Sequence, residues 1–488
     1  MLFEPLLEHA EHQPNETAII DDRGRYTYGQ LGAMATGLSL LFRMQIDRPR
    51  VGLLLPAGAG FVASFYGTLL AGKAVVPINF LLGDKEIAHV IADSEIDTIV
   101  TAPPLSGRLK DLSIKIIDLT QLPQSPPVGL RAILPEMKAD DLAVLMYTSG
   151  TSGMPKGVLL SFGNLQSDID AAIEAAALQS RHHFLGVIPL FHAFGMTAMM
   201  LAPVQLGSTI VYMARFSPAG TLSAIREHGI SLMFGVPSMY AAIARLKDAK
   251  PEDFAQMYAM ITGGEPLPSG VRELFQQRFG VPLYEGYGLT ETSPVISLNT
   301  PQANKPGSVG KPLPGVEVKI VGDDGSVRPT GEDGEIWLHG PMIMQGYHHL
   351  PKETAESLTP DRFFKTGDYG KINSDGYLHI TGRKKDLIII AGEKAVPREI
   401  EEVLASHPEV AEAAVLGKKD PSRGEVVAAF VIAKEGTSPS AESLREHCRD
   451  KGLPQWKIPR EIRFVPDLPR SPMGKVLKRV LAEQLLLA

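Results

Sequence analysis

The stretch that decides the fold is Tyr147-Thr148-Ser149-Gly150-Thr151-Ser152-Gly153-Met154-Pro155-Lys156-Gly157. It follows the apolar run from Leu142 to Met146, which predicts a buried strand. Its glycines allow the backbone to turn tightly and direct N–H groups at an anion, while its hydroxyls and Lys156 add further donors. The alternative is a Ser/Gly-rich surface loop. The spacing differs from Walker A because Gly157 directly follows the lysine. We therefore predict a loop that binds a polyphosphate.

The segment that follows alternates short apolar runs with a helical pattern. Residues 184–188, 208–213 and 230–236 are typical of buried strands. Leu222 and Ile225 fall on one face of a short helix that Gly229 can close in the left-handed conformation. Alternation of strands and helices favours an α/β fold, in which helices cover mostly parallel sheets.

The composition changes twice further along the chain. From Lys305, glycines and prolines separate short strands at 316–320 and 335–338, which indicates a small β-barrel-like subdomain over about 305–382. Residues 387–390 predict a strand, and Pro397 suits the first position of a helix with Ile400, Val403 and Leu404 on one face. The predicted organisation is a large domain over 1–382, a hinge at 383–386 and a mobile α+β domain over 387–488.

Composition excludes several classes of protein. The 488 residues are 44% hydrophobic and 21% charged, which is ordinary for a globular protein. A net charge of -7 argues against a nucleic-acid binder. The single cysteine, Cys448, excludes an internal disulfide and points to a reducing compartment. The start shows no secretory signal, and residues 51–82, broken by Pro56 and Lys73, are too interrupted to span a membrane. We expect a soluble cytoplasmic protein, and this expectation allows transient contact with a membrane surface.

The whole chain resembles the adenylate-forming superfamily of acyl-CoA synthetases, luciferases and peptide-synthetase adenylation domains. The motifs that carry the resemblance follow the family's order: 147–157, Pro189-Leu190-Phe191-His192-Ala193-Phe194-Gly195, Gly263-Gly264-Glu265-Pro266-Leu267, Glu285-Gly286-Tyr287-Gly288-Leu289-Thr290-Glu291-Thr292, Thr366-Gly367-Asp368, Gly382-Arg383-Lys384-Lys385-Asp386 and Ser471-Pro472-Met473-Gly474-Lys475. Taken alone, each motif can also be interpreted as a feature without a catalytic or binding role, such as a turn or a solvated charge. Together, and in this order, they indicate the family.

The resemblance implies which residues act. It assigns catalysis to Lys475, Thr290, Glu291 and His192, with Glu291 as the Mg²⁺ ligand and Asp368 on the ribose hydroxyls. A hard cation such as Mg²⁺ prefers carboxylate and phosphate oxygens. The residues assigned to ATP or AMP are Thr148, Ser149, Gly150, Thr151, Ser152, Lys156, Gly263, Gly264, Glu265, Glu285, Gly286, Tyr287, Gly288, Thr290, Asp368, Arg383 and Lys475.

The same resemblance implies two half-reactions. A carboxylate attacks the α-phosphate of ATP to give an acyl adenylate and pyrophosphate, and a thiol then displaces AMP. In the family, the small domain rotates between the steps about a pivot that corresponds to Lys385, and Gly392 lies close to the pantetheine arm. Free CoA is the expected acceptor, and an acyl-carrier protein is the alternative, because the catalytic motifs suit both.

The acid is expected to be a medium- or long-chain fatty acid, because the surroundings of His192 and Gly286 most resemble bacterial fatty acyl-CoA ligases. An acyl pocket should be largely apolar. Its candidate residues are His192, Met196, Met199, Met200, Phe234, Val236, Gly286 and Val295. Phe234 and Val236 stand where amino-acid-activating relatives carry an acidic residue, which disfavours an amino acid. An aryl acid, such as benzoate or a hydroxycinnamate, is the alternative substrate.

Overall fold

The computed structural model describes residues 1–122, 131–148, 154–470 and 476–486. Its backbone packs into two compact units. The first unit comprises Met1–Leu267, Leu274–Glu317 and Leu338–Phe364, and the second comprises Pro268–Glu273, Val318–Trp337 and Lys365–Ala488. The predicted α/β class is confirmed, with mixed sheets and helices in the larger part and a smaller C-terminal part. The predicted boundaries at 382 and 387 stay a prediction.

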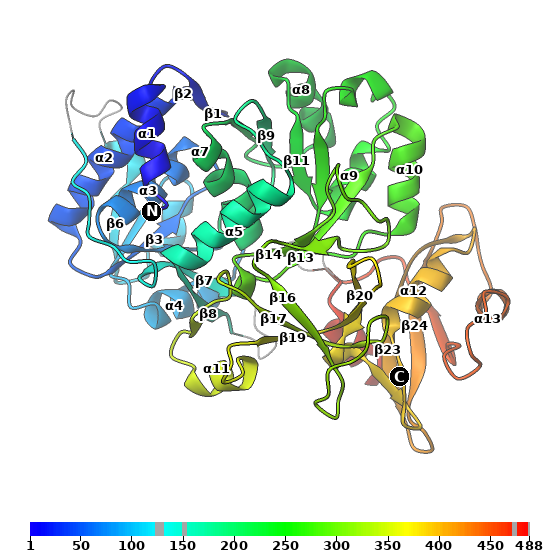
Figure 1. Ribbon diagram of the computed structural model, residues 1–488. Coiled ribbons are helices and arrows are strands. Elements are labelled where there is room, and N and C mark those ends of the chain that lie inside the picture. Colours follow the sequence, from blue (N-terminus) through cyan, green and yellow to red (C-terminus); the bar gives the residue numbers. More distant parts are fainter. Residues whose placement is uncertain (123–130, 149–153, 471–475, 487–488) are drawn as a thin grey trace. The chain divides into compact units, whose positions relative to one another are not determined.

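The first unit contains a nine-stranded sheet among its described residues, with the order β15-β14-β13-β12-β11-β9-β10-β1-β2. Its six inner strands, from β13 to β1, are parallel, whereas β2, β14 and β15 pair antiparallel. Figure 1 follows it from the green β11, β13 and β14 to the blue β1. The strands are β1 (Thr17–Asp21), β2 (Gly24–Thr27), β9 (His183–Gly186), β10 (Thr209–Tyr212), β11 (Leu232–Gly235), β12 (Ala259–Thr262), β13 (Leu283–Gly288), β14 (Val295–Leu298) and β15 (Lys311–Pro312).

A seven-stranded sheet also lies in the first unit, with the order β18-β8-β7-β4-β3-β5-β6. Its strands are β3 (Arg50–Leu54), β4 (Ala74–Pro77), β5 (Thr98–Thr101), β6 (Lys115–Asp118), β7 (Leu142–Thr148), β8 (Lys156–Ser161) and β18 (Gly346–Tyr347). The apolar stretch 51–82 supplies β3, β4 and the buried helix α3 (Ala59–Leu70), so its hydrophobicity belongs to the core. Within the described chain, no helix has the length and apolar character that crossing a bilayer requires.

Helices cover these two sheets. They are α1 (Glu4–His12), α2 (Tyr28–Gln45), α4 (Asp84–Asp93), α5 (Phe162–Ala175), α6 (Ala193–Met196), α7 (Ala202–Leu206), α8 (Pro218–His228), α9 (Pro237–Ile243), α10 (Ser269–Phe279) and α11 (Pro351–Ser357). The predicted strands before and after α8 are present, and α8 ends as predicted at Gly229, whose φ is 59°. The side chain of Ser161 starts α5 by accepting the N–H of Asn164 at 3.1 Å.

The second unit is built on two smaller sheets. The first has the order β16-β17-β19-β20, and the second has the order β22-β21-β24-β23, with β25 on β24. These strands are β16 (Glu317–Val321), β17 (Gly334–His339), β19 (Phe364–Ile372), β20 (Leu378–Arg383), β21 (Ile388–Ile390), β22 (Glu393–Ala395), β23 (Val410–Asp420), β24 (Gly424–Ala433) and β25 (Glu461–Phe464).

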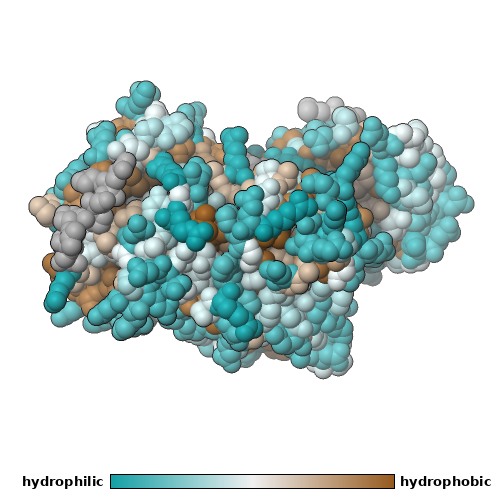
Figure 2. Space-filling view, turned by 90° about the horizontal axis from the view of Figure 1, so that it is seen from above, coloured by the Kyte–Doolittle hydropathy of each residue, from teal (hydrophilic) through white to brown (hydrophobic). Residues whose placement is uncertain are grey.

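The described residues of the second unit also form the helices α12 (Pro397–Ala405), α13 (Ala441–Asp450) and α14 (Lys478–Leu486). Pro397 opens α12 as predicted, and Ile400 and Leu404 are fully buried in its core. Cys448 is a buried, free thiol in the same core. The outer surface seen in Figure 2 is mostly hydrophilic, with small scattered hydrophobic spots.

Candidate active site

The two ends of the predicted phosphate loop are held by a strand pair. Strands β7 and β8 are antiparallel, and Thr148 at the end of β7 lies opposite Lys156 at the start of β8. Both residues are partly exposed. The intervening candidates Ser149, Gly150, Thr151 and Ser152, like Lys475, lie outside the described residues. The strand before the loop was predicted correctly, and the hairpin fixes where the lysine emerges.

A polar group surrounds the start of β8. The Nζ atom of Lys156 lies 5.9 Å from the centre of the Tyr347 ring, a cation–π distance. The Tyr347 hydroxyl donates a 2.8 Å hydrogen bond to Oε1 of Glu291. Burial, followed by the nearby Glu291 charge, raises the pKa of Tyr347, so its hydroxyl stays a proton donor. We call Lys156, Tyr347 and Glu291 the polar group.

Three separate chain segments build the polar group. Strand β18 pairs with β8, which brings Tyr347 opposite Val158. Glu291 lies in the 3-10 turn Thr290–Thr292, and the N–H of Met344 donates to its carbonyl at 2.9 Å. Tyr347 was not among the predicted site residues, because its only local signal is an aromatic residue after Gly346. Its position depends on a strand pairing that no short motif records.

An apolar wall forms where β11, β12 and β13 end. These neighbouring strands are parallel, so their carboxyl ends share one edge of the sheet, the usual place for ligands in open α/β sheets. A methyl group on Gly263 would lie 3.3 Å from the Gly286 carbonyl oxygen and 3.7 Å from the Phe194 ring. A methyl group on Gly264 would lie 3.9 Å from Val236. The structure thus brings these predicted residues together.

Aromatic rings and a neutral histidine complete this wall. The rings of Phe194 and Phe234 meet edge to face at 6.1 Å, and those of Phe191 and His192 lie 4.7 Å apart. The Nε2 atom of His192 is buried and has no hydrogen-bond partner among the described residues. Burial lowers the pKa of His192 to about 4, so the imidazole is neutral at pH 7. We call His192, Phe194, Phe234, Val236 and Gly286 the apolar wall.

Three methionines and a buried acid lie around this region. Met196 ends α6, and Met199 and Met200 follow it in the π-helical turn Thr197–Leu201; all three are fully buried. Val295 donates its backbone N–H to Oδ1 of Asp168 at 3.1 Å. Asp168 is wholly buried, and desolvation raises its pKa well above the usual range for a carboxyl group.

The segment from Glu285 to Gly288 is a strand, so the alternative interpretation of this motif as a turn was wrong. It forms the end of β13 opposite β14. The Glu285 side chain is buried and accepts the N–H of Leu267 at 3.0 Å. A methyl group on Gly288 would come within 1.7 Å of the Pro294 carbonyl oxygen, which explains the glycine there. Gly264 and Glu265 do follow a strand, β12.

The second unit brings Asp368 and Arg383 together. They lie opposite each other on β19 and β20, with 3.1 Å between Arg383 Nε and Asp368 Oδ1. Asp368 is only 3% exposed, and its N–H donates to the Thr366 hydroxyl. Lys385 is exposed in the 3-10 turn Lys384–Asp386.

Gly392 occupies a two-residue turn between β21 and β22. Ala391 and Gly392 have φ angles of 51° and 92°, and Ile390 lies opposite Glu393. Glycine at this position is therefore explained by the turn, whether or not a ligand approaches it. Its predicted contact with the pantetheine arm stays a prediction.

The same unit contains a cavity that the sequence analysis did not predict. It has a volume of about 290 Å³ and is lined by four arginines and an aromatic ring: Arg423, Arg445, Arg449, Arg460 and Trp456. Glu442 pairs with Arg449 at 2.8 Å and with Arg445 at 3.3 Å. Arg423 is exposed and makes no ion pair with other residues that the structure describes. The lining carries an excess of positive charge.

Comparisons with known proteins identify the family to which this chain is similar. The AMP-binding enzyme family model matches residues 6–348, and the AMP-binding enzyme C-terminal domain model matches residues 399–475. A feruloyl-CoA synthase from Amycolatopsis sp is 34% identical over 97% of this chain and 96% of its own. A long-chain-fatty-acid–CoA ligase from Bacillus subtilis is 32% identical over 98% and 93%. ATP-bound MatB from Rhodopseudomonas palustris superimposes with a TM-score of 0.91, at 28% identity over 99% and 98% of the two chains.

Proposed function

The chain belongs to the AMP-binding enzyme family and is an acyl-CoA synthetase, and from this premise we propose that it activates a medium- or long-chain fatty acid and transfers the acyl group to CoA. The observation that carries the proposal is the apolar wall. Its side chains are apolar or, for His192, neutral at pH 7. An acid with a second charge would therefore leave that charge unpaired there, at a high desolvation cost.

The proposed reaction has two balanced steps. One oxygen of the ionised acid bonds to the α-phosphorus of ATP while the bond to the bridging oxygen breaks, releasing pyrophosphate. The acid is already deprotonated at neutral pH, so this step needs no general base. The CoA sulfur then bonds to the acyl carbon, the thiol proton passes to water, and AMP leaves with the electron pair of the broken C–O bond.

We assign the phosphate end of ATP to the polar group and its neighbours. Lys156 supplies a mobile positive charge, and Thr290 supplies a hydroxyl donor. The Glu291 carboxylate suits Mg²⁺, because this ion is bound through a small number of carboxylates together with substrate phosphates. Such an ion would neutralise phosphate charge. The Tyr347 hydroxyl, 2.8 Å from Glu291, would hold that carboxylate in one orientation.

The remaining assignments follow the resemblance. Asp368, which pairs with Arg383, is proposed to accept hydrogen bonds from the ribose hydroxyls. The adenine site is proposed to be lined by Gly263, Gly264, Glu265 and the Glu285–Gly288 strand. Neutral His192 is assigned to the acyl side, where its buried Nε2 atom can hydrogen-bond the carboxylate. Lys475 keeps its proposed role as the adenylation lysine, for which a compact mobile charge is suited to an anionic transition state.

The arginine-lined cavity favours free CoA as the acceptor. CoA carries a diphosphate and a 3′-phosphate, and arginine binds such groups with paired, charge-assisted hydrogen bonds. Trp456 also lines the cavity, and its ring, with Lys457 Nζ 5.2 Å from the ring centre, is proposed to stack on the adenine through its other face. A carrier protein presents the pantetheine arm without this nucleotide, so it would leave the positive cavity unfilled.

An aryl acid is the second candidate for the substrate. Phe191, Phe194 and Phe234 supply rings at 4.7–6.2 Å from neighbouring aromatic side chains, and edge-to-face packing would stabilise a planar acid by about 0.5–1.5 kcal/mol. The feruloyl-CoA synthase among the relatives acts, by its name, on an acid of this class.

Pyrophosphate release across a panel of acids tests the proposal. The panel contains acetate, octanoate, palmitate, benzoate, ferulate and malonate, each with CoA and with a phosphopantetheine carrier protein. We expect octanoate or palmitate to give the highest kcat/KM with CoA. Preference for benzoate or ferulate would support the aryl candidate, and preference for malonate or for the carrier protein would contradict the proposal.

The role of the arginine cavity is tested with Arg423→Ala. The KM for CoA should rise about tenfold, since each unmade charge-assisted hydrogen bond costs about 1.5–3 kcal/mol before solvent screening. Turnover with pantetheine, which lacks the nucleotide, should be unchanged. Lys434→Ala removes an exposed charge just beyond the opposite end of β24 and is the matched control. An equal effect of both variants would contradict the assignment.

A further inference from the structure

Glu95, His348 and His349 form a cluster that the proposed reaction does not use. Each offers one metal-ligating atom, and these atoms all lie within 4.8 Å of one another. Glu95 follows α4, and the two histidines follow β18. We propose that these three residues bind one divalent transition-metal ion, for which Zn²⁺ is the probe. The proposal does not depend on the substrate or the reaction assigned above.

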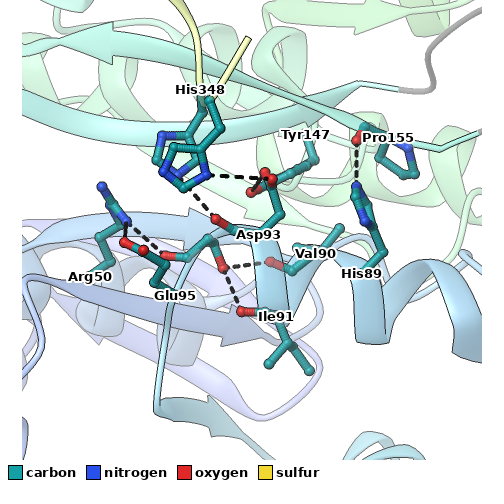
Figure 3. A network of polar contacts seen from close by, with 11 residues as sticks. Arg50, His89, Val90, Ile91, Asp93, Glu95, Tyr147, Pro155 and His348 are labelled. Atoms are coloured by element: carbon teal, nitrogen blue, oxygen red, sulfur yellow. Dashed lines mark hydrogen bonds and ion pairs between the residues drawn. The ribbon is translucent and has the colours of Figure 1, made fainter.

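The hydrogen bond of His348 leaves one ring nitrogen with its lone pair available to a metal. Its Nε2 atom lies 3.0 Å from the carbonyl oxygen of Asp93. A carbonyl only accepts, so Nε2 carries the hydrogen and Nδ1 keeps its lone pair. Metal-binding histidines usually donate their second N–H to a carbonyl or carboxylate in this way. Figure 3 shows His348 above Asp93, with Glu95 on the side of Arg50.

The backbone brings the other two ligands to the same place. Glu95 and His349 both have φ angles of 55°, a left-handed conformation that costs about 1–2 kcal/mol in residues other than glycine. Successive side chains of a regular strand point to opposite faces. Here the ring of His349 instead stacks on that of His348, with 3.7 Å between the ring centres. This conformation is what places two imidazoles beside one carboxylate.

The charges of the neighbouring side chains are compatible with a bound cation. Arg50 pairs with Glu95 through Oε2 at 3.1 Å, so Oε1 is the oxygen proposed to bind the metal. The Asp93 carboxylate offsets the arginine, with its Oδ1 atom 3.8 Å from Nδ1 of His349. Its Oδ2 atom accepts the hydroxyl of Tyr147 at 2.6 Å, which fixes the orientation of Asp93. Two carboxylates and one guanidinium thus lie near the two rings.

The donor set selects the ion. Two imidazoles and one carboxylate suit Zn²⁺, Ni²⁺ or Cu²⁺, whereas Mg²⁺ and Ca²⁺ prefer oxygen ligands alone. Three protein ligands leave a coordination position for water. The side chains of His349 and Glu95 are 53% and 55% exposed, so both have space to rotate towards a bound ion.

The test is zinc titration of the full, untagged chain after chelator treatment, without nucleotide because triphosphates bind Zn²⁺. We expect calorimetry to give one ion per chain, and Co²⁺ to give a visible absorption band of a four-coordinate site. Zn²⁺ should also raise the Tm, since the assembled site binds it more tightly than the unfolded chain does. His349→Asn, which tolerates the left-handed backbone, and Glu95→Gln should each weaken Zn²⁺ affinity by roughly tenfold or more.

The control is a histidine pair without a carboxylate ligand. His407 and His447 lie 5.1 Å apart in the second unit, and they do not belong to the metal-ligating group found among the described residues. His447→Ala should leave zinc affinity, stoichiometry and the Tm shift unchanged. Unaltered zinc affinity in both His349→Asn and Glu95→Gln, or an equal loss in His447→Ala, would overturn the proposal.

Discussion

The polar group and the apolar wall belong to the same unit, yet they are held in different ways. Tyr347 and Glu291 are joined by one hydrogen bond between residues 56 positions apart in the sequence. Gly286, Phe194 and Phe234 are placed by strand register and ring packing. A directed hydrogen bond is lost when one atom changes, whereas packing responds to volume. We therefore expect the polar group to fail by removal of a charge or donor, and the apolar wall to fail by addition of bulk.

The largest effect is expected from Glu291→Gln. This variant keeps the shape of the side chain and removes the charge assigned to Mg²⁺·ATP, so kcat/KM for pyrophosphate release should fall about 10²–10³-fold. Thioester formation from supplied acyl adenylate should change much less. Glu356→Gln, at an exposed position on α11, is the matched control. A loss below tenfold would remove Glu291 from the catalytic machinery.

Gly286→Leu tests the apolar wall by adding bulk. Gly286 is extended on β13, and a methyl group there would lie 2.9 Å from Leu298 Cδ1 and 3.4 Å from the Ser297 carbonyl oxygen. Added volume in a packed region costs about 1–3 kcal/mol. We expect long and medium acids to lose kcat/KM while acetate and the ATP KM change little.

Comparison of acetate, octanoate, palmitate and benzoate on wild type, Gly286→Ala and Gly286→Leu separates the outcomes. The smaller alanine variant should shift the preference in the same direction by less. An equal fall for all four acids in Gly286→Leu would mean that the glycine serves only the strand pairing and that the acyl channel lies elsewhere.

His192 gives the wall a pH dependence that appears in stability. Burial favours neutral imidazole and lowers its pKa to about 4 in the folded state, against about 6.5 in the unfolded chain. Below pH 6.5 the unfolded chain binds the proton more readily, so the stabilisation by neutral His192 is complete above pH 6.5 and is lost as the pH falls towards 4. At pH 5 this loss is about 2 kcal/mol relative to pH 7.5.

Urea unfolding of wild type and His192→Phe at pH 7.5 and pH 5 measures this contribution of His192 to the free energy of unfolding. The variant should lose about 2 kcal/mol less than wild type between the two pH values. His12→Gln, at an exposed position on α1, controls for removal of any histidine and should behave as wild type. Identical pH dependence in wild type and His192→Phe would show that His192 is solvated in the folded protein.

Local patterns predicted the parts of this molecule that local physics determines. Apolar runs located β7 and β11, and the special conformations of proline and glycine located the start of α12 and the end of α8 at Gly229. The strand at Glu285–Gly288 was less predictable, because its glycines are required by close contact with a neighbouring strand whose position the sequence does not show.

The parts of the site that depend on distant segments could not be read from the chain. Tyr347 meets Lys156 only because β18 pairs with β8. The arginine cavity is lined by separate segments of the second unit, with Arg423 before β24 and Arg445 and Arg449 on α13. The motifs that carry the family resemblance pointed to Glu291 and Asp368 as site residues. The roles of these two residues remain predictions.

Tyr347→Phe is the smallest expected change and the sharpest test of how the polar group is held. The variant keeps the ring, so the 5.9 Å contact with Lys156 Nζ persists, and it removes only the hydroxyl that orients Glu291. Loss of such a supporting hydrogen bond costs about tenfold or more in metal affinity. The KM for ATP should therefore rise about tenfold at limiting Mg²⁺ and recover at high Mg²⁺, with kcat nearly unchanged. Tyr377→Phe, in the second unit, is the matched control and should show no dependence on Mg²⁺. If Tyr347→Phe instead lowered kcat equally at all Mg²⁺ concentrations, the hydroxyl would act on the reacting groups and not through the carboxylate.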